Sequence, residues 1–206
     1  MAAQFVKPYL KNQKNDTNDA EAIAEAVQRP TMRFVGIKRL DQIDTQALHR
    51  VRDRLVRQQT QIITQTRSLC WEFGITMPTG VPTFCRDLQD VLEDAENELT
   101  PRMRRLIAAL WDEFRDVQHR LKMASDEVKA IAANDETARR LMSVPGIGEI
   151  TATAIISAIG NPKDFRRGRD LAAWIGLVPR QHSTGGQTRL LGISKRGNPY
   201  LRRLLV

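Results

Sequence analysis

The sequence predicts a mostly α-helical protein built around a long antiparallel helical arm. Leucine and isoleucine recur every seven residues between positions 48 and 69, and apolar residues continue at helical spacing over 103–131. Glycine and proline interrupt both patterns near 74–82 and 145–148. Such periodicity is typical of amphipathic helices, and glycine and proline mark where they end. The pattern indicates three consecutive regions: residues 1–35, 36–134 and 135–206.

The first region, residues 1–35, contains one predicted helix. Residues 20–27 are rich in alanine and glutamate, which favour helix formation. Pro30 ends this helix, because proline disfavours the helical conformation in the residue before it. Asn15 or Asp16 stands at the start, where asparagine and aspartate are favoured as caps.

The arm begins with a helix predicted from about Asp44 to Phe73. Its apolar stripe repeats every seven residues, as in a coiled coil, and consists of Leu48, Leu55, Ile62 and Leu69. The other faces of this helix carry arginine and glutamine. A single helix cannot bury such a stripe. We therefore expect a second helix to cover part of it, and the arm to mediate homo-oligomerisation.

The second long helix of the arm follows a short acidic helix near residues 88–99. Thr100 and Pro101 are residue types favoured at a helix cap and at the first helical position. Apolar residues then recur at helical spacing as far as Ile131. The two long helices are therefore predicted to pack antiparallel, with Trp111 and Phe114 in the core between them.

Charge sets the third region apart. From Thr137 to Val206 there are 12 lysines and arginines against 3 aspartates and glutamates, a balance of +9, whereas the remainder has −1. A basic region on an otherwise neutral chain indicates a polyanion as partner. A basic surface that only aids solubility is the alternative. The glycine-rich loops in the same region favour a nucleic acid, and we expect duplex DNA as the partner.

Composition argues against several other classes of protein. Cys70 and Cys85 are too few for a disulfide framework or a cysteine metal site, and both are expected to be small buried groups. The N-terminal residues lack the apolar core of a signal peptide, and no apolar run has the length of a membrane span. We therefore expect a cytoplasmic protein with no membrane partner.

The third region is predicted to contain short helices and one strand. Its expected elements are a helix capped by Asp135 and ending at Met142, helices over Glu149–Ile159 and Asp170–Trp174, a strand over Thr188–Ile193, and a last helix starting at Asn198. Glycine-rich turns separate these elements, and two of the turns are candidate phosphate-binding sites.

The turn over residues 145–148 resembles a helix-hairpin-helix DNA-binding motif. Gly146 and Gly148 lead into a helix N-terminus, where exposed backbone N–H groups and the helix dipole favour a phosphate. Thr151 and Thr153 are candidate hydroxyl donors beside them. The alternative is an ordinary corner between packed helices, and the basic charge of the region favours contact with a DNA backbone.

A second glycine-rich segment carries the candidate nucleophile, Ser183. Gly185 and Gly186 follow it, and the lack of a Cβ lets a backbone approach a phosphate closely. The candidate phosphate-binding cations are Arg180, Lys195 and Arg196. A serine hydroxyl attacks a phosphodiester only when it is activated. By local composition alone, a plain loop rich in serine and glycine is the simpler interpretation.

Asp16 and Asp19 are the candidate metal ligands. Because they stand three residues apart at a helix start, both carboxylates can share one face. Mg²⁺ typically takes one or two carboxylates together with phosphate oxygens and water. By spacing alone, helix capping and favourable charge near the helix dipole explain these residues better.

Three motifs in this order resemble those of insertion-sequence 110 family transposases. They are Asn-Asp-x-x-Asp-Ala at residues 15–20, Gly-Leu-x-Pro-x-x-x-Ser-x-Gly-Gly at residues 176–186, and Ile-Ser-Lys-Arg-Gly-Asn at residues 193–198. The resemblance covers nearly the whole chain. It implies that Ser183 is the nucleophile of a DNA strand exchange. It also implies that Asp16 and Asp19 are the last two of four acids that bind Mg²⁺ in a RuvC-like domain.

The resemblance implies an organisation and partners as well. Residues 1–35 would be the end of a RuvC-like α/β domain, 36–134 a coiled-coil arm, and 135–206 an incomplete DNA-binding serine transposase domain. Members of the family work on DNA as oligomers with a structured RNA made by the element, near the prokaryotic nucleoid. In the family, two further acids and most of a sheet precede Asp16, and more helix follows the position of Val206. We therefore expect a chain truncated at both ends.

Truncation leaves a second function open, namely a catalytically inactive module that binds DNA and oligomerises. A purely structural coiled-coil adaptor is a third hypothesis. It leaves the charge and the glycine-rich loops of residues 135–206 unexplained.

Overall fold

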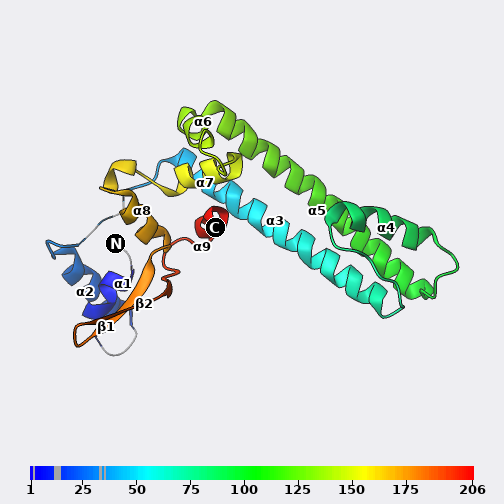
Figure 1. The fold of residues 1–206 in the computed structure, drawn as a ribbon, viewed down its shortest axis with the longest axis horizontal. Coiled ribbons are helices and arrows are strands. Elements are labelled where there is room, and N and C mark those ends of the chain that lie inside the picture. Colours follow the sequence, from blue (N-terminus) through cyan, green and yellow to red (C-terminus); the bar gives the residue numbers. More distant parts are fainter. Residues whose placement is uncertain (2, 12–14, 33, 35) are drawn as a thin grey trace.

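The protein is mostly helical, as expected, and contains a small antiparallel sheet. The computed structural model describes residues 1, 3–11, 15–32, 34 and 36–206. Helices α3 (Leu40–Trp71) and α5 (Pro101–Asn134) lie antiparallel and form the long axis of the molecule (Figure 1). Helix α4 (Val81–Glu93) packs on α5 at the end of the arm remote from the C-terminus.

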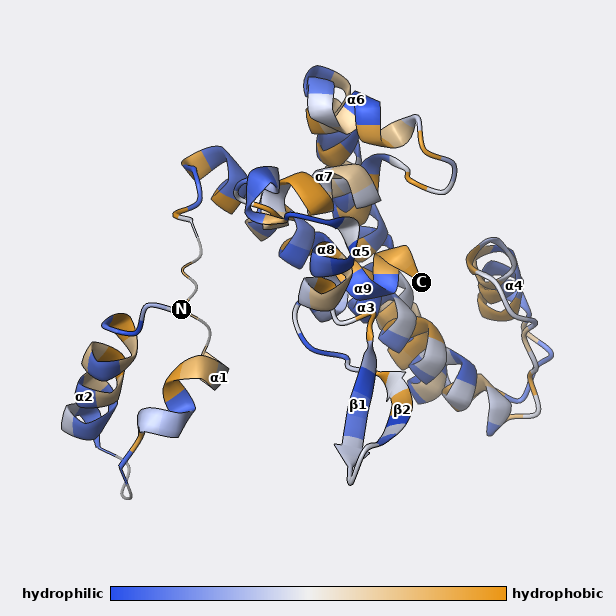
Figure 2. Ribbon diagram, turned by 60° about the vertical axis from the view of Figure 1, so that its left-hand side comes forward, coloured by the Kyte–Doolittle hydropathy of each residue, from blue (hydrophilic) through white to orange (hydrophobic). Residues whose placement is uncertain are grey.

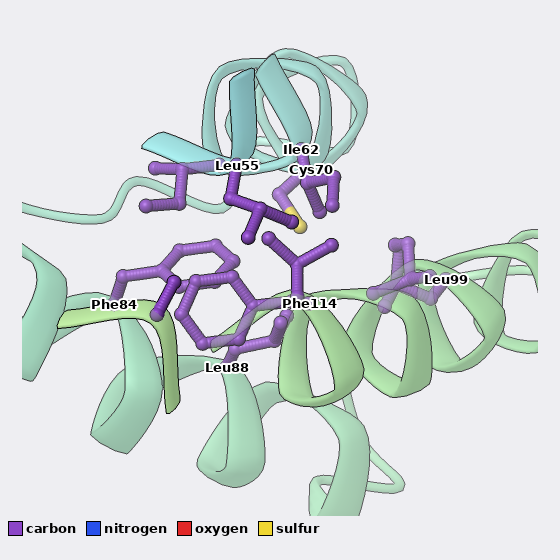
Figure 3. Close-up of a cluster of buried hydrophobic side chains, with 11 residues drawn as sticks. Leu55, Ile62, Cys70, Phe84, Leu88, Leu99 and Phe114 are labelled. Carbon is purple, nitrogen blue, oxygen red and sulfur yellow. The ribbon is translucent and has the colours of Figure 1, made fainter. Parts of the chain in front are cut away.

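The core of the arm lies between these three helices. Figure 3 shows Leu55, Ile62 and Cys70 of α3 facing Phe84 of α4 and Phe114 of α5. Leu55 and Ile62 are only 2% and 4% exposed. The two central residues of the predicted heptad stripe are therefore covered within a single chain, as the antiparallel pairing predicted. Cys70 is buried and Cys85 is half-buried, both as free thiols.

The predicted helix caps are present at three helix starts. The Asn15 side chain accepts a hydrogen bond from the backbone N–H of Asn18 at 2.7 Å and begins α2 (Asp16–Val27). Thr100 caps α5, and Asp135 caps α6 (Glu136–Met142) by accepting from the N–H of Ala138 at 2.8 Å. Each side-chain oxygen satisfies one N–H that the first helical turn leaves without a partner.

Helix α3 begins four residues before the predicted start because its first turn docks on another helix. The Gln42 side chain donates to the backbone carbonyls of Ile156 and Ile159, each at 3.1 Å. These carbonyls end helix α7 (Glu149–Ala158), which packs against both α3 and α5. The base of the arm and the C-terminal residues therefore share one packed region.

The remaining C-terminal elements lie beside this base. They are a 3₁₀ turn η2 (Pro162–Asp164), helix α8 (Gly168–Ile175), strands β1 (Pro179–Thr184) and β2 (Gln187–Ile193), and helix α9 (Pro199–Leu205). Strand β2 was predicted to within one residue at each end. Its partner β1 was not, because its residues are polar and show no alternation.

The N-terminal elements pack on one another. Helix α1 (Ala3–Val6), the 3₁₀ turn η1 (Lys7–Tyr9) and α2 form this group. Figure 2 shows α1 and α2 set apart from the β1–β2 hairpin and from the arm. Throughout the described part of the chain, no helix combines the length and the apolar character needed to cross a membrane.

Candidate nucleic-acid interface

Ser183 lies on a β-hairpin in which every strand residue is exposed to solvent. Strands β1 and β2 pair Ser183 with Thr188 and Thr184 with Gln187, so Gly185 and Gly186 form a two-residue turn. Their φ values are +56° and +80°. Two successive positive φ angles match the right-handed twist of a hairpin and favour glycine at both positions. The glycines therefore shape the turn that follows the candidate nucleophile.

The hydroxyl of Ser183 has one neighbouring partner. The Gln181 Nε2 donates to Ser183 Oγ at 2.8 Å, between two residues on the same face of β1. No hydrogen bond joins Ser183 Oγ to a carboxylate or a histidine within the described residues. An amide donor orients a hydroxyl but does not remove its proton, so attack by this oxygen requires a further activating group.

The segment that follows the hairpin is hydrogen-bonded to the residues at the end of α8. The backbone N–H of Ser194 donates to the Val178 carbonyl at 2.8 Å, and that of Lys195 to the Gly176 carbonyl at 3.1 Å. Arg202 of α9 donates to the carbonyls of Ile175 and Arg196, both at 2.9 Å. This brings the two sequence motifs at residues 176–186 and 193–198 into direct contact.

The cations of the hairpin region point to solvent. Arg180, Lys195 and Arg196 are all exposed. Lys195 has a positive φ of +55°, which is uncommon for a residue with a side chain. None of the three makes an ion pair with an acid within the described residues. Their positive charge is therefore available to an external anion.

The turn between α6 and α7 exposes backbone N–H groups. Gly146 has a φ of +88°, and Gly148 is the N-cap of α7 with no side-chain cap. Both glycines are exposed, with no atom near the position of an added Cβ. An uncapped helix N-terminus reached across open glycines is suited to an anion. Thr151 is buried, at 7% exposed, unlike the two glycines.

The two candidate metal ligands lie on the first turn of α2. Asp16 is exposed and Asp19 is partly buried. Across the described ranges, no three side chains of histidine, cysteine, aspartate or glutamate come together as a metal site. Two carboxylates supply only part of the near-octahedral shell that Mg²⁺ requires. The described residues therefore do not form a complete magnesium site.

The structure does not bring these acids to Ser183. Helix α2 belongs to the N-terminal group, and Figure 2 shows that group well away from the β1–β2 hairpin. The glycine turn before α7 and the hairpin both belong to the C-terminal third of the chain. Within one chain, the candidate phosphate-binding groups are thus separated from the candidate metal ligands.

A buried polar network at the base of the arm was not predicted from the sequence. The two ring nitrogens of His49 on α3 lie 3.1 Å from the Tyr200 hydroxyl of α9 and 2.9 Å from the Thr153 hydroxyl of α7. Burial, assisted by the nearby charge of Arg52, lowers the pKa of His49 to about 4. The imidazole is therefore neutral at physiological pH and links three helices.

Asp53 adds a charged link beside this network. It forms ion pairs with Arg57 of α3 and with Arg203 of α9, and it is only 8% exposed. Burial disfavours its charged form, but the hydrogen bonds and charges of the two arginines outweigh burial and hold its pKa below the usual value. Only tertiary structure reveals this link, because Asp53 and Arg203 are far apart in sequence.

Several known proteins with similar sequences are named as transposases. The chain is 46% identical to "Transposase for insertion sequence element IS1111A" of Coxiella burnetii, over 100% of this chain and 57% of that protein. It is 45% identical to "Probable family 20 transposase" of Pseudomonas aeruginosa and 46% identical to "Transposase for insertion sequence element IS1328" of Yersinia enterocolitica. In both cases 100% of this chain and 61% of the relative are covered.

These relatives define the class of protein as a transposase. Residues 138–206, which hold both glycine turns and Ser183, match the family model "Transposase IS116/IS110/IS902 family". The chain belongs to this family of insertion-sequence transposases. It spans 57% to 61% of the length of the three relatives.

Proposed function

We propose that this chain acts in DNA transposition, with Ser183 as the nucleophile of strand cleavage and exchange. The observation that carries the proposal is the exposed hydroxyl of Ser183 beside a glycine turn and unpaired cations, in a chain related to transposases. In this step Ser183 Oγ bonds to a DNA phosphorus, and one phosphodiester P–O bond breaks. The serine proton leaves to a base, and the departing DNA oxygen is protonated.

The C-terminal residues hold the DNA backbone in this proposal. Arg180, Lys195 and Arg196 neutralise phosphates near the hairpin. Gly146 and Gly148 present backbone N–H groups to a further phosphate, a contact that positions DNA without reading its sequence. The two glycine turns thus supply separate anchoring points on one duplex.

Asp16 and Asp19 are proposed to contribute to a Mg²⁺ site that needs further ligands. Mg²⁺ would polarise the phosphate and favour attack by a hydroxyl. Because the described residues do not complete the metal shell, the activity of this chain by itself is not part of the proposal. A DNA-binding and oligomerisation module without catalysis is the second candidate, and the separation of α2 from the hairpin favours it for a single isolated chain.

We extend the proposal to partners by family relation. The chain would self-associate through the arm and bind a structured RNA encoded by the element. It would act at the bacterial nucleoid. The exposed apolar side chains on the arm include Val51, Leu106 and Met123. They remain available to a second copy after the two central residues of the heptad stripe have been covered within one chain.

The catalytic proposal is tested by a covalent adduct assay. The chain is incubated with element-end DNA, Mg²⁺, the element's RNA and the N-terminal part of the Coxiella relative as a separate polypeptide. A protein–DNA adduct on a denaturing gel is expected, and Ser183→Ala should abolish it. Thr184→Ala, which removes the neighbouring hydroxyl of the same strand, should retain it. An adduct that survives Ser183→Ala would refute the assignment of the nucleophile.

A further inference from the structure

One face of α3 differs from an ordinary solvent-exposed helix face. From residue 45 to residue 71 the helix has five arginines and one acid, Asp53. Asp53 is almost fully buried and paired with Arg57 and Arg203. Exposed faces of helical arms usually mix both signs of charge. The partner helix α5 follows that rule, with pairs such as Arg120–Asp116 and Arg115–Asp112.

The exposed polar side chains of α3 form a continuous stripe. At 100° per residue, seven of them fall on one side of the helix, opposite the buried Leu55 and Ile62. This group, called the α3 stripe, consists of Arg50, Arg54, Arg57, Gln61, Thr64, Gln65 and Ser68, all of them exposed. It offers cations at one end and neutral hydrogen-bonding groups at the other. Glu113 of α5 lies at its edge, where Gln58 donates to it at 3.0 Å.

Two recesses lie along the α3 stripe, and C-terminal residues line one of them. A recess of about 320 Å³ at the base of the arm is lined by Arg50, Arg57 and, from the C-terminal elements, Asn198 and Tyr200. A second recess beside it is lined by Arg54, Arg57, Gln58 and Gln61. Arg50 and Arg54 have no ion-pair or hydrogen-bond partner among the residues that the structure describes.

We propose that the α3 stripe binds the sugar-phosphate backbone of duplex DNA, extending the interface of the C-terminal residues along the arm. The charge is complementary, and arginine, glutamine, threonine and serine are the side chains that contact phosphate oxygens. The stripe from Arg50 to Ser68 is about 27 Å long at 1.5 Å per residue. That is most of one turn of B-DNA, about 34 Å. This inference rests on the proposed function, because DNA is the partner named there.

The test measures the salt dependence of binding of the full chain to a 30-base-pair duplex. Arg50→Gln/Arg54→Gln removes two cations of the stripe and leaves the Asp53 pairs intact. Arg115→Gln/Arg120→Gln removes the same charge from α5. The first variant should lower the slope of log affinity against log salt by about 1.8, because each phosphate contact contributes about 0.9. The second should bind as the original chain does. Circular dichroism checks that both variants remain folded.

A crosslinking experiment locates the contact independently. Benzoylphenylalanine is placed at Gln61 of the stripe or, as the matched control, at the exposed Gln118 of α5. Crosslinks to the duplex are expected from position 61 and not from position 118. An Arg50→Gln/Arg54→Gln variant that binds like the α5 control, together with no crosslink at position 61, would overturn the inference. The inference would also be overturned if Arg50→Gln/Arg54→Gln weakened binding to a duplex RNA of equal length but left DNA binding unchanged.

A C-terminal variant separates this inference from the proposed function. Lys195→Gln/Arg196→Gln should weaken DNA binding if the hairpin region is an interface. If only this variant weakens binding, the α3 stripe is excluded and the proposed function stands. If the original chain shows no salt-dependent DNA binding at all, both are rejected.

Discussion

Gly176 and Gly197 lie on the two sides of one backbone contact between α8 and the segment after the hairpin. A Cβ on Gly176 would lie 2.0 Å from the Arg196 carbonyl oxygen, and one on Gly197 would lie 1.9 Å from the Trp174 carbonyl oxygen. Both residues have positive φ values, +85° and +80°. This contact is the physical reason why glycine stands at these places in the motif that contains Ser183 and in the motif that follows it.

Gly197→Ala should destabilise the protein. The added methyl group must displace the backbone of Trp174, and alanine disfavours a positive φ. The combined cost is about 2–4 kcal/mol, or a melting temperature lower by about 5–15 °C for a chain of this length. Gly192→Ala is the control, because no atom lies within 4 Å of the new Cβ there. Equal melting temperatures for the two variants in a calorimetric scan would contradict the assigned contact.

Leu55→Ala should destabilise the arm without requiring a second copy. Leu55 is 2% exposed and packs among α3, α4 and α5 of one chain. Removing its side chain leaves a cavity and should cost about 2–5 kcal/mol. Val51→Ala, on the same helix but 46% exposed, should cost much less. The measurement is urea unfolding at two protein concentrations. A loss of stability that depends strongly on concentration would indicate that the stripe is instead covered by another chain.

Stability should fall as the pH drops from about 6.5 towards 4. The folded state holds the pKa of His49 at about 4, below the usual 6.5, because burial disfavours the imidazolium. The contribution of neutral His49 is thus complete above pH 6.5 and is lost as pH falls to the folded pKa. The two pKa values differ by about 2.5, which corresponds to a loss of about 3 kcal/mol in the free energy of unfolding.

His49→Gln tests the origin of this pH dependence. The variant should flatten stability between pH 6.5 and pH 4, whereas His119→Gln, at an exposed position, should leave the profile unchanged. Asp53 acts in a separate, more acidic range, because its pKa lies below the usual aspartate value. A profile that stays as steep in His49→Gln would assign the effect to other groups.

The chain by itself should form no covalent adduct with DNA. Ser183 accepts a hydrogen bond from an amide donor, and helix α2, which carries Asp16 and Asp19, lies apart from the hairpin. No third metal-ligating side chain joins these two acids among the described residues. A serine hydroxyl needs a base or a polarised phosphate to react at neutral pH. Incubation with Mg²⁺, element-end DNA and the element's RNA should therefore yield no adduct. An adduct that depends on Ser183 would show that one chain suffices.

Binding of DNA by the C-terminal residues should depend steeply on salt. The balance of +9 after residue 136 predicts several phosphate contacts. If there are six or more, affinity should fall by about 10³-fold or more between 50 and 200 mM salt. Fluorescence anisotropy with the full chain and two duplexes of unrelated sequence measures this fall. Binding that is insensitive to salt would exclude a contact with the phosphate backbone.

The sequence by itself determined the two long helices of the arm and the identity of the family, whereas the short acidic helix expected near residues 88–99 lies at Val81–Glu93. Periodic apolar residues predicted α3 and α5, and Thr100, Asp135 and Asn15 predicted helix starts, because caps and amphipathic spacing are local properties of a helix. The ordered motifs around Ser183 were likewise readable without coordinates. Serine and glycine at residues 183–186 indicated a loop, and strand β1 was not predicted because its polar residues lack alternation.

Tertiary structure alone decided which residues share a site. It joined His49 to Thr153 and Tyr200, paired Asp53 with Arg203, and gave Gly176 and Gly197 a common contact. It also separated Asp16 and Asp19 from Ser183 and left the α3 stripe uncovered. These relationships link residues up to 151 positions apart in sequence. Local propensity and periodicity extend over only a few turns, so contacts of that range depend on how the helices pack.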